Sequence, residues 1–218
     1  MKKMIVISVL GVIILGGVCA FFVGKDGNAE NYYNRKETSQ TEKMLYNIGA
    51  ESRENIKSAN DNEDDTVVDS ENIKKNAEVY AKETNQSSQK VEKKMTEKSI
   101  EKKALLLAAR DEGISVTEQE VSKAIQDLKE AYNKNETSKK ELQAVIAGTG
   151  LSEKEYWDYV KPEYEENMVI NKYLESKYKK KAEQSSIAYG TEQYYEKAKI
   201  WREDLAQEAV EKYNITVE

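Results

Sequence analysis

Apolar and polar residues divide the chain into three stretches with different patterns. Residues 4–23 form an apolar run without a charged side chain, and residues 25–65 are mostly polar. Residues 66–218 carry apolar side chains at the three- and four-residue spacing that is typical of helices. We therefore expect an N-terminal apolar segment over residues 1–24, a flexible polar tether over 25–65 and one helical domain over 66–218.

The apolar run predicts a membrane anchor. Its 20 residues match the length that a helix needs to cross about 30 Å of hydrocarbon. Lys2 and Lys3 precede it, which predicts a cytoplasmic N-terminus and an extracytoplasmic domain in a single-pass protein of the cell membrane. A cleaved signal peptide, with a secreted product, is the alternative. Val18 directly before Cys19 is a poor match to a lipid-modified cysteine.

The polar tether contains one small apolar island, formed by Met44, Leu45, Tyr46 and Ile48. The residues around this island are mostly Asn, Glu, Ser, Thr and Lys. A segment of such composition buries too little apolar surface to offset the entropy lost on folding. We expect a fluctuating segment, with a short helix or a partner contact as the alternatives.

The helical domain begins with a long amphipathic stretch from Ser70 to Glu112. The spacing predicts either one long helix or two helices broken around residues 85–88. The end of this stretch, Ala104 to Ala109, is apolar nearly all round, so we expect other helices to surround it. Gly113 follows in the position where a helix C-terminal cap is expected.

Pairs of Ser or Thr with Glu three residues later predict the starts of the next helices. Such pairs are Thr117 with Glu120, Ser138 with Glu141 and Ser152 with Glu155, and Thr191 can cap a last helix. Pro162 lies inside the helix after Ser152, where we expect a kink or a restart of the helix. The predicted fold class is all-α, with long helices.

Two short β-prone runs lie at the ends of the helical domain. They are Thr66–Val68 and the last residues of the chain, in which Ile215 and Val217 are apolar. We expect these runs to pair as a minor pair of terminal strands, which would join the two ends of the domain.

Composition argues against several classes of function. The chain has no histidine and a single cysteine, Cys19, whereas zinc sites, Ser-His-Asp and Cys-His catalysis and disulfide frameworks need these residues. The net charge of −6 argues against nucleic-acid binding. No carboxylate pair stands out among the 40 acidic residues. We therefore expect no enzyme activity and no cofactor or metal.

The order of motifs between Val91 and Leu174 resembles the chaperone domain of the SurA, PrsA and trigger factor group. The clearest stretch is ALLLAARDEGISVTEQEVSKAI, Ala104 to Ile125. In it an apolar helix end, a Gly-Ile-Ser-Val-Thr turn and a second amphipathic helix follow one another. Leu142–Glu155 and Tyr156–Leu174 repeat the short helix, the turn and the long helix that come next in the group.

The resemblance implies an extracytoplasmic holdase that binds unfolded or extended polypeptide without ATP. Extracytoplasmic members usually carry a parvulin prolyl isomerase domain between their last two helices, and here only residues 182–191 stand in that place. Parvulin sites also use histidine, which this chain lacks, so we expect no isomerase activity. An envelope scaffold or sensor ectodomain that docks one dedicated protein partner is the alternative function.

The aromatic composition suggests a surface that meets many polypeptide sequences. The chain has 14 tyrosines and two tryptophans, whose rings combine apolar area with a hydrogen-bonding atom. The candidate peptide-binding residues are large, amphipathic or flexible side chains beside the helix stripes: Tyr132, Tyr156, Trp157, Tyr164 and Met168. Packing of these side chains in the helical core is the competing interpretation.

Overall fold

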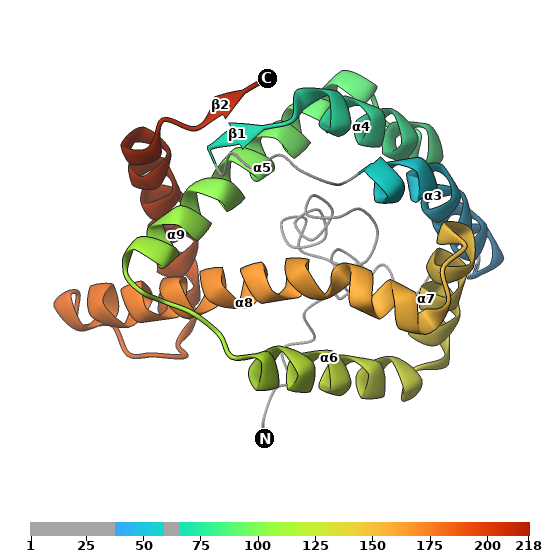
Figure 1. Cartoon of the computed structure of the whole chain (residues 1–218). Helices are drawn as coiled ribbons and strands as arrows, with labels where there is room; N and C mark the ends of the chain where they lie inside the picture. The colour runs from blue at the N-terminus through green and yellow to red at the C-terminus, as the bar shows by residue number, and fades with distance from the viewer. Residues whose placement is uncertain (1–37, 59–65) are drawn as a thin grey trace.

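The computed structural model describes residues 38–58 and 66–218 of the chain. Seven helices and two short strands lie within these ranges (Figure 1). This confirms the mainly helical fold class. None of the helices in the two ranges is long and apolar enough to cross a membrane. The predicted membrane segment over residues 1–24 lies outside the described residues.

The first helical stretch of the domain consists of two helices, α4 (Ser70–Thr84) and α5 (Ser88–Asp111). Asn85 follows α4 with a φ of 54°, a left-handed conformation that Asn adopts more easily than most residues. Gly113, with a φ of 69°, closes α5. The Ile114 N–H donates to the Ala109 carbonyl there, and the Gly113 N–H donates to the Arg110 carbonyl. These two hydrogen bonds satisfy carbonyl groups at the end of the helix.

The remaining helices are α6 (Glu118–Asn133), α7 (Glu136–Thr149), α8 (Glu153–Gln184) and α9 (Glu192–Tyr213). Capping boxes at the starts of α6 and α8 and the cap of α9 confirm three predicted helix starts. The box expected at Ser138 is wrong, because Asn135 accepts a hydrogen bond from the Ser138 N–H and begins α7 three residues earlier. Helix α8 continues through Pro162.

The two predicted terminal strands do pair. β1 (Val67–Val68) and β2 (Thr216–Val217) run parallel, with Val67 opposite Thr216 and Val68 opposite Val217. The Thr216 N–H donates to Thr66 at 3.0 Å, the Glu218 N–H to Val68 at 3.0 Å and the Ser70 N–H to Glu218 at 2.7 Å. These backbone bonds join the C-terminus of the chain to the start of α4.

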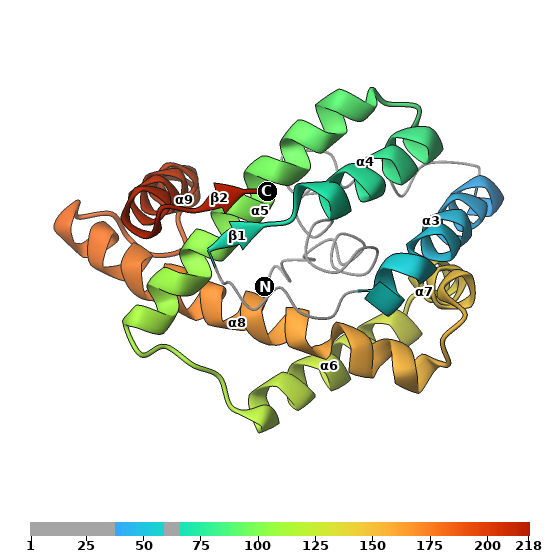
Figure 2. The same ribbon diagram turned by 45° about the horizontal axis from the view of Figure 1, so that its top comes forward.

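The helices follow one another around a ring (Figures 1 and 2). Helix α3 (Thr38–Ser58) packs against α4, α4 against α5 and α5 against α8, and α6 and α7 complete the ring back to α3. Helix α9 lies outside this ring, against α5 and α8. The apolar core is therefore divided among separate helix contacts and is not gathered at one centre.

Three apolar clusters hold most of this ring together. The first joins α5, α8 and α9 through residues such as Leu105, Ile170 and Leu205. The second joins α6, α7 and α8, and the third joins α4, α5 and β1. Helix α3 contributes Leu45 to the second cluster and Ile48 to the third. It therefore closes the ring between two clusters that lie on different helices.

The flexible tether predicted over residues 25–65 is wrong for residues 38–58, which form α3. Leu45 and Ile48, in the island expected to fluctuate, are 2% and 0% exposed. They lie three residues apart, so a helix places them on the same side, facing α4 and α7. The rest of the predicted tether lies outside the described residues.

Candidate functional site

The five candidate residues from the sequence gather in one apolar cluster. Tyr132 comes from α6 and the other four come from α8. Tyr132, Tyr156 and Trp157 are 4%, 1% and 3% exposed. The Trp157 ring meets the Tyr156 ring edge-on at 5.7 Å and lies 6.5 Å from the Tyr132 ring.

These three side chains are core residues, which corrects the expectation that they line an exposed surface. Tyr156 and Trp157 are neighbours in the sequence, so they point in directions about 100° apart around α8. Both are nevertheless buried, because the cluster draws side chains from α6 and α7 and includes Leu45 of α3. For these residues the competing interpretation, packing in the core, is the one that the structure supports.

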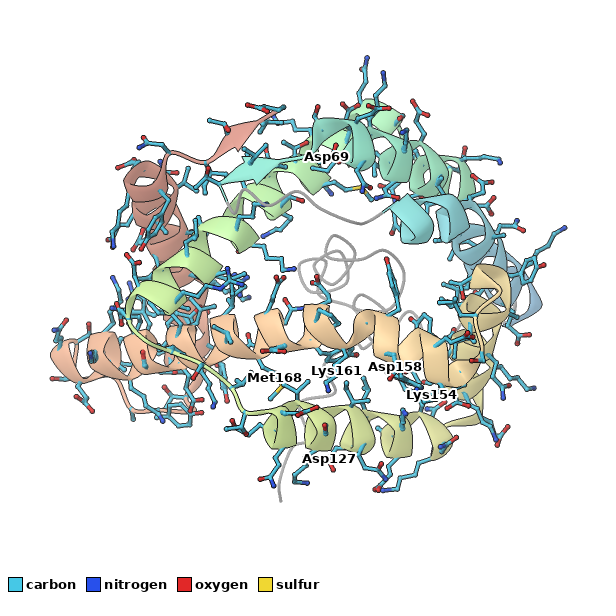
Figure 3. The ribbon with its side chains drawn as sticks, in the orientation of Figure 1. Asp69, Asp127, Lys154, Asp158, Lys161 and Met168 are labelled. Atoms are coloured by element: carbon cyan, nitrogen blue, oxygen red, sulfur yellow. The ribbon has the colours of Figure 1, made fainter. Side chains whose placement is uncertain are left out.

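Tyr164 and Met168 lie at the edge of this cluster and are half-buried. Figure 3 shows Met168 between α8 and α6. The Tyr164 hydroxyl is buried and has no hydrogen-bond partner among the described residues. Burial, with a smaller effect from Glu163, raises the pKa of Tyr164. Because an unpaired buried hydroxyl costs about 1–3 kcal/mol, this position is not optimised for stability.

A partly buried cluster of charges lies at the crossing of α5 and α8. The Lys102 ammonium lies 2.5 Å from a carboxylate oxygen of Glu163 and 2.5 Å from one of Glu166. The Asn167 amide donates to the second Glu163 oxygen at 3.0 Å. Burial by itself lowers the pKa of Lys102, but the two carboxylates outweigh it and hold this pKa above its usual value. The charged groups therefore support one another where the two helices meet.

Charged contacts also tie the start of α6 to α8. Lys161 lies 2.9 Å from Glu118, and Lys172 lies 2.7 Å from Glu120 and donates to the Ser115 carbonyl at 3.2 Å. The hydrogen bond from Lys172 and those from Thr117 lower the pKa of Glu120 to about 2. Figure 3 shows Lys161 on α8 above α6. These contacts are exposed to solvent, so they set the orientation of α6 more than they stabilise it.

An aromatic cluster at the turn between α8 and α9 reaches the surface of the protein. We call it the aromatic turn, and it consists of Tyr178, Tyr189, Tyr194, Tyr195 and Trp201. The ring of Tyr194 lies 4.8 Å from Tyr189, 5.5 Å from Tyr195 and 6.0 Å from Trp201, and Tyr178 lies 6.1 Å from Trp201. Such distances are typical of favourable ring contacts.

The aromatic turn has a buried base and an exposed tip. Tyr194 and Trp201 are buried, while Tyr189 and Tyr195 are 65% and 47% exposed. The buried rings limit how the exposed rings can move, so little side-chain entropy remains to be lost on binding. Tyrosine at the surface offers apolar area together with a hydroxyl that pairs with peptide groups.

Sequence reasoning missed the aromatic turn as a candidate site. A signal was present, because Tyr189, Tyr194, Tyr195 and Trp201 lie close together around Gly190. The spacing alone did not separate the buried rings from the exposed ones. Within the described part of the chain, no group of acidic, His or Cys side chains is arranged to hold a metal ion.

Comparison with known proteins supports the resemblance found in the sequence. A family model described as "SurA-like N-terminal domain" matches residues 1–174. No curated protein and no solved structure matches the chain. The matched range includes α3 to α7 and most of α8, and so it covers the whole ring of helices except the end of α8. The chain therefore belongs to the family of SurA-like N-terminal domains.

Proposed function

We propose that the protein is a membrane-anchored extracytoplasmic holdase, which binds unfolded or extended polypeptide and has no isomerase activity. Membership of the SurA-like family supports a chaperone-type role. The observation that carries the proposal is the aromatic turn, with two exposed tyrosines on a base of buried rings.

Unfolded polypeptides expose scattered apolar side chains and unpaired backbone groups. Tyr189 and Tyr195 can bind both, because each ring is apolar and each hydroxyl forms hydrogen bonds. Among the described residues, the other exposed large apolar side chains are Tyr46, Ile200 and Val217. The aromatic turn brings two such side chains together. We expect weak binding of each client segment, and tighter binding when one client makes several contacts.

Aggregation suppression tests the proposed function. The full chain, reconstituted in lipid nanodiscs, should slow the aggregation of several unrelated unfolded proteins, and empty nanodiscs should not. Replacing Tyr189 and Tyr195 with Ala should remove much of this effect and lower the melting temperature only slightly, since both side chains are exposed and lose only their ring contacts with Tyr194. Ile200→Ala is the matched control, because Ile200 is an exposed apolar residue on the same helix, α9, as Tyr195.

Two other results would change the proposal. Equal suppression by the double variant would show that clients bind elsewhere. Failure of the wild-type chain to suppress any aggregation, together with saturable binding of one envelope protein, would favour a scaffold or sensor ectodomain. Prolyl isomerisation of a model peptide should stay at the uncatalysed rate in every case.

The apolar run over residues 4–23 supports the membrane part of the proposal. Protease added to intact cells should digest the helical domain if it lies outside the membrane. N-terminal sequencing of the mature protein should find the segment retained. A mature protein that starts near Phe21 or Glu30 would instead indicate signal cleavage and a secreted product.

A further inference from the structure

Helix α3 occupies a seat between α4 and α7 (Figure 2). On the α7 side, Leu45 packs in the cluster that contains Leu142 and Val145. On the α4 side, Ile48 packs in the cluster that contains Ile73 and Ala77. We call this site the α3 seat. Its walls are mostly apolar, and α3 packs against both of them.

Two glycines let α3 and α7 touch backbone to backbone. A Cβ atom added to Gly49 of α3 would lie 2.6 Å from the Val145 carbonyl oxygen. A Cβ atom added to Gly148 of α7 would lie 2.2 Å from the Tyr46 carbonyl oxygen. Both distances are far below van der Waals contact, and the atoms that would clash belong to helix backbones. The seat therefore requires a glycine in its occupant at the crossing point.

The sequence of α3 makes it a weak helix by itself. Gly49 lies in its interior, where glycine costs about 1 kcal/mol relative to alanine. Across residues 41–51 only Leu45, Ile48 and Gly49 are buried. A polar helix with glycine in its interior is only marginally stable in water unless an apolar face is packed. The helical form of α3 therefore depends on the seat, as expected for a ligand that folds when it binds.

Polar contacts at the rim of the seat set the direction in which α3 docks and add little to the free energy of docking. The Asn47 amide donates to both carboxylate oxygens of Glu83 on α4, at 3.2 and 3.3 Å. Lys82 lies 2.6 Å from Glu51 across an exposed interface, where ion pairs contribute little.

One charged residue in the α3 seat disfavours docking of α3. Glu141 of α7 is buried, and burial, together with Glu42 of α3, raises its pKa. A like-charge pair at this interface disfavours the docked state while both groups are ionised. The seat thus combines close backbone packing of α3 with one unfavourable charge interaction.

We propose that the α3 seat binds amphipathic helical segments of client polypeptides, and that α3 is its built-in occupant, which clients displace. This inference rests on the proposed function and names one class of client. The client helix carries two apolar residues three positions apart, followed directly by glycine, as Leu45, Ile48 and Gly49 do in α3. The aromatic turn would hold extended segments, and the seat would hold segments with helical tendency.

The experiment uses the full chain in nanodiscs and a fluorescent synthetic peptide with the sequence of residues 38–58. In the wild-type chain the tethered α3 competes at a high effective concentration, so peptide binding should be weak. Gly49→Leu in the chain prevents its own α3 from docking and should tighten peptide binding at least about 10-fold. A peptide with the same Gly49→Leu change should not bind.

Gly148→Ala tests the seat from the other side. Added to the Gly49→Leu chain, it should abolish peptide binding, because its Cβ atom clashes with any helix that crosses there. Alanine also favours the helical form of α7 itself. Lys140→Ala, an exposed change on the same helix, should leave peptide binding unchanged.

Hydrogen exchange tests whether α3 can leave the seat while the rest of the domain stays folded. In the Gly49→Leu chain, amides of residues 41–51 should lose protection while those of α5, α8 and α9 keep it. Loss of protection throughout the domain, also in the milder Gly49→Ala chain, would show that α3 is an obligatory part of the fold and would overturn the inference. A wild-type dimer that Gly148→Ala dissociates would overturn it as well, because a second copy would then be the occupant.

Aggregation assays separate this inference from the proposed function. Suppression that is equal in the wild-type and Gly148→Ala/Gly49→Leu chains would leave the holdase in place and refute the seat as a client site. Absence of suppression in every chain would refute the holdase even if the peptide still binds.

Discussion

Replacing Lys102 with Met should weaken the domain by breaking its partly buried charge cluster. Lys102 on α5 holds Glu163 and Glu166 of α8 at 2.5 Å each. Methionine is of similar length and keeps the packing of the apolar stem, but it removes the positive charge. Two carboxylates then remain together at the crossing of α5 and α8 without a cation.

The burial of the three charged side chains sets the expected size of the loss in the free energy of unfolding. The side chains of Lys102, Glu163 and Glu166 are 11%, 13% and 34% exposed. Removing one partner of a buried ion pair costs about 3–5 kcal/mol. Glu166 can turn toward water and Glu163 keeps its bond from Asn167, so we expect the lower end, about 3 kcal/mol. For a domain of this size that loss corresponds to a fall of about 6–12 °C in Tm.

Chemical denaturation followed by circular dichroism measures this loss. Lys93→Met, on the same helix, is the matched control, because the pair of Lys93 with Glu97 at 3.9 Å is exposed to solvent. Adding Glu163→Gln to Lys102→Met should recover part of the stability, since it removes one of the two unpaired charges. A loss for Lys102→Met no larger than that for Lys93→Met would refute the reasoning and show that the cluster is hydrated.

Three further predictions concern the ends, the core and the pH response of the domain. Deleting residues 216–218 removes the backbone bonds of β2 and should lower the free energy of unfolding by about 2–3 kcal/mol, whereas an unchanged melting temperature would show that the strand pair does not contribute. Trp157→Ser should lower the free energy of unfolding by about 3–5 kcal/mol, because the ring is buried. Tyr164→Phe should raise it by about 1 kcal/mol, because this change removes an unpaired hydroxyl. Thermal melts of the two variants test these expectations. The Glu120 pKa, lowered to about 2 mainly by the hydrogen bond from Lys172, predicts a contribution to stability that is complete above pH 4.5 and is lost as the pH falls toward 2. Glu120→Gln should therefore reduce the loss of stability over that range in acid titrations.

Local signals in the sequence were sufficient to place most helix ends. The side chain of Thr117 accepts from a backbone N–H three residues later, so the cap of α6 is complete within one turn. The same is true of Ser152 in α8. The error at Ser138 has a local cause too, because Asn135 is an equally good cap and stands first.

The exposure of the aromatic residues could not be predicted in this way. Trp157 and Tyr189 are both large aromatic side chains in polar surroundings of the sequence, yet one is 3% and the other 65% exposed. The difference arises because α6 and α7 pack against the start of α8, while the turn after α8 faces solvent. Helices distant in the sequence therefore decide which rings form core and which form a surface.

By itself, the sequence determined the apolar N-terminal run, most helix boundaries and the two β-prone runs at the ends of the helical domain, since these follow from short-range patterns. The order of motifs carried the resemblance to the SurA-like family. Only the tertiary structure decided that residues 38–58 form a helix. Gly49 disfavours that helix locally, and it forms because Gly49 meets Gly148 of α7 and the flanking apolar residues enter two separate clusters. Such packing depends on residues about 100 positions apart, which no local pattern contains.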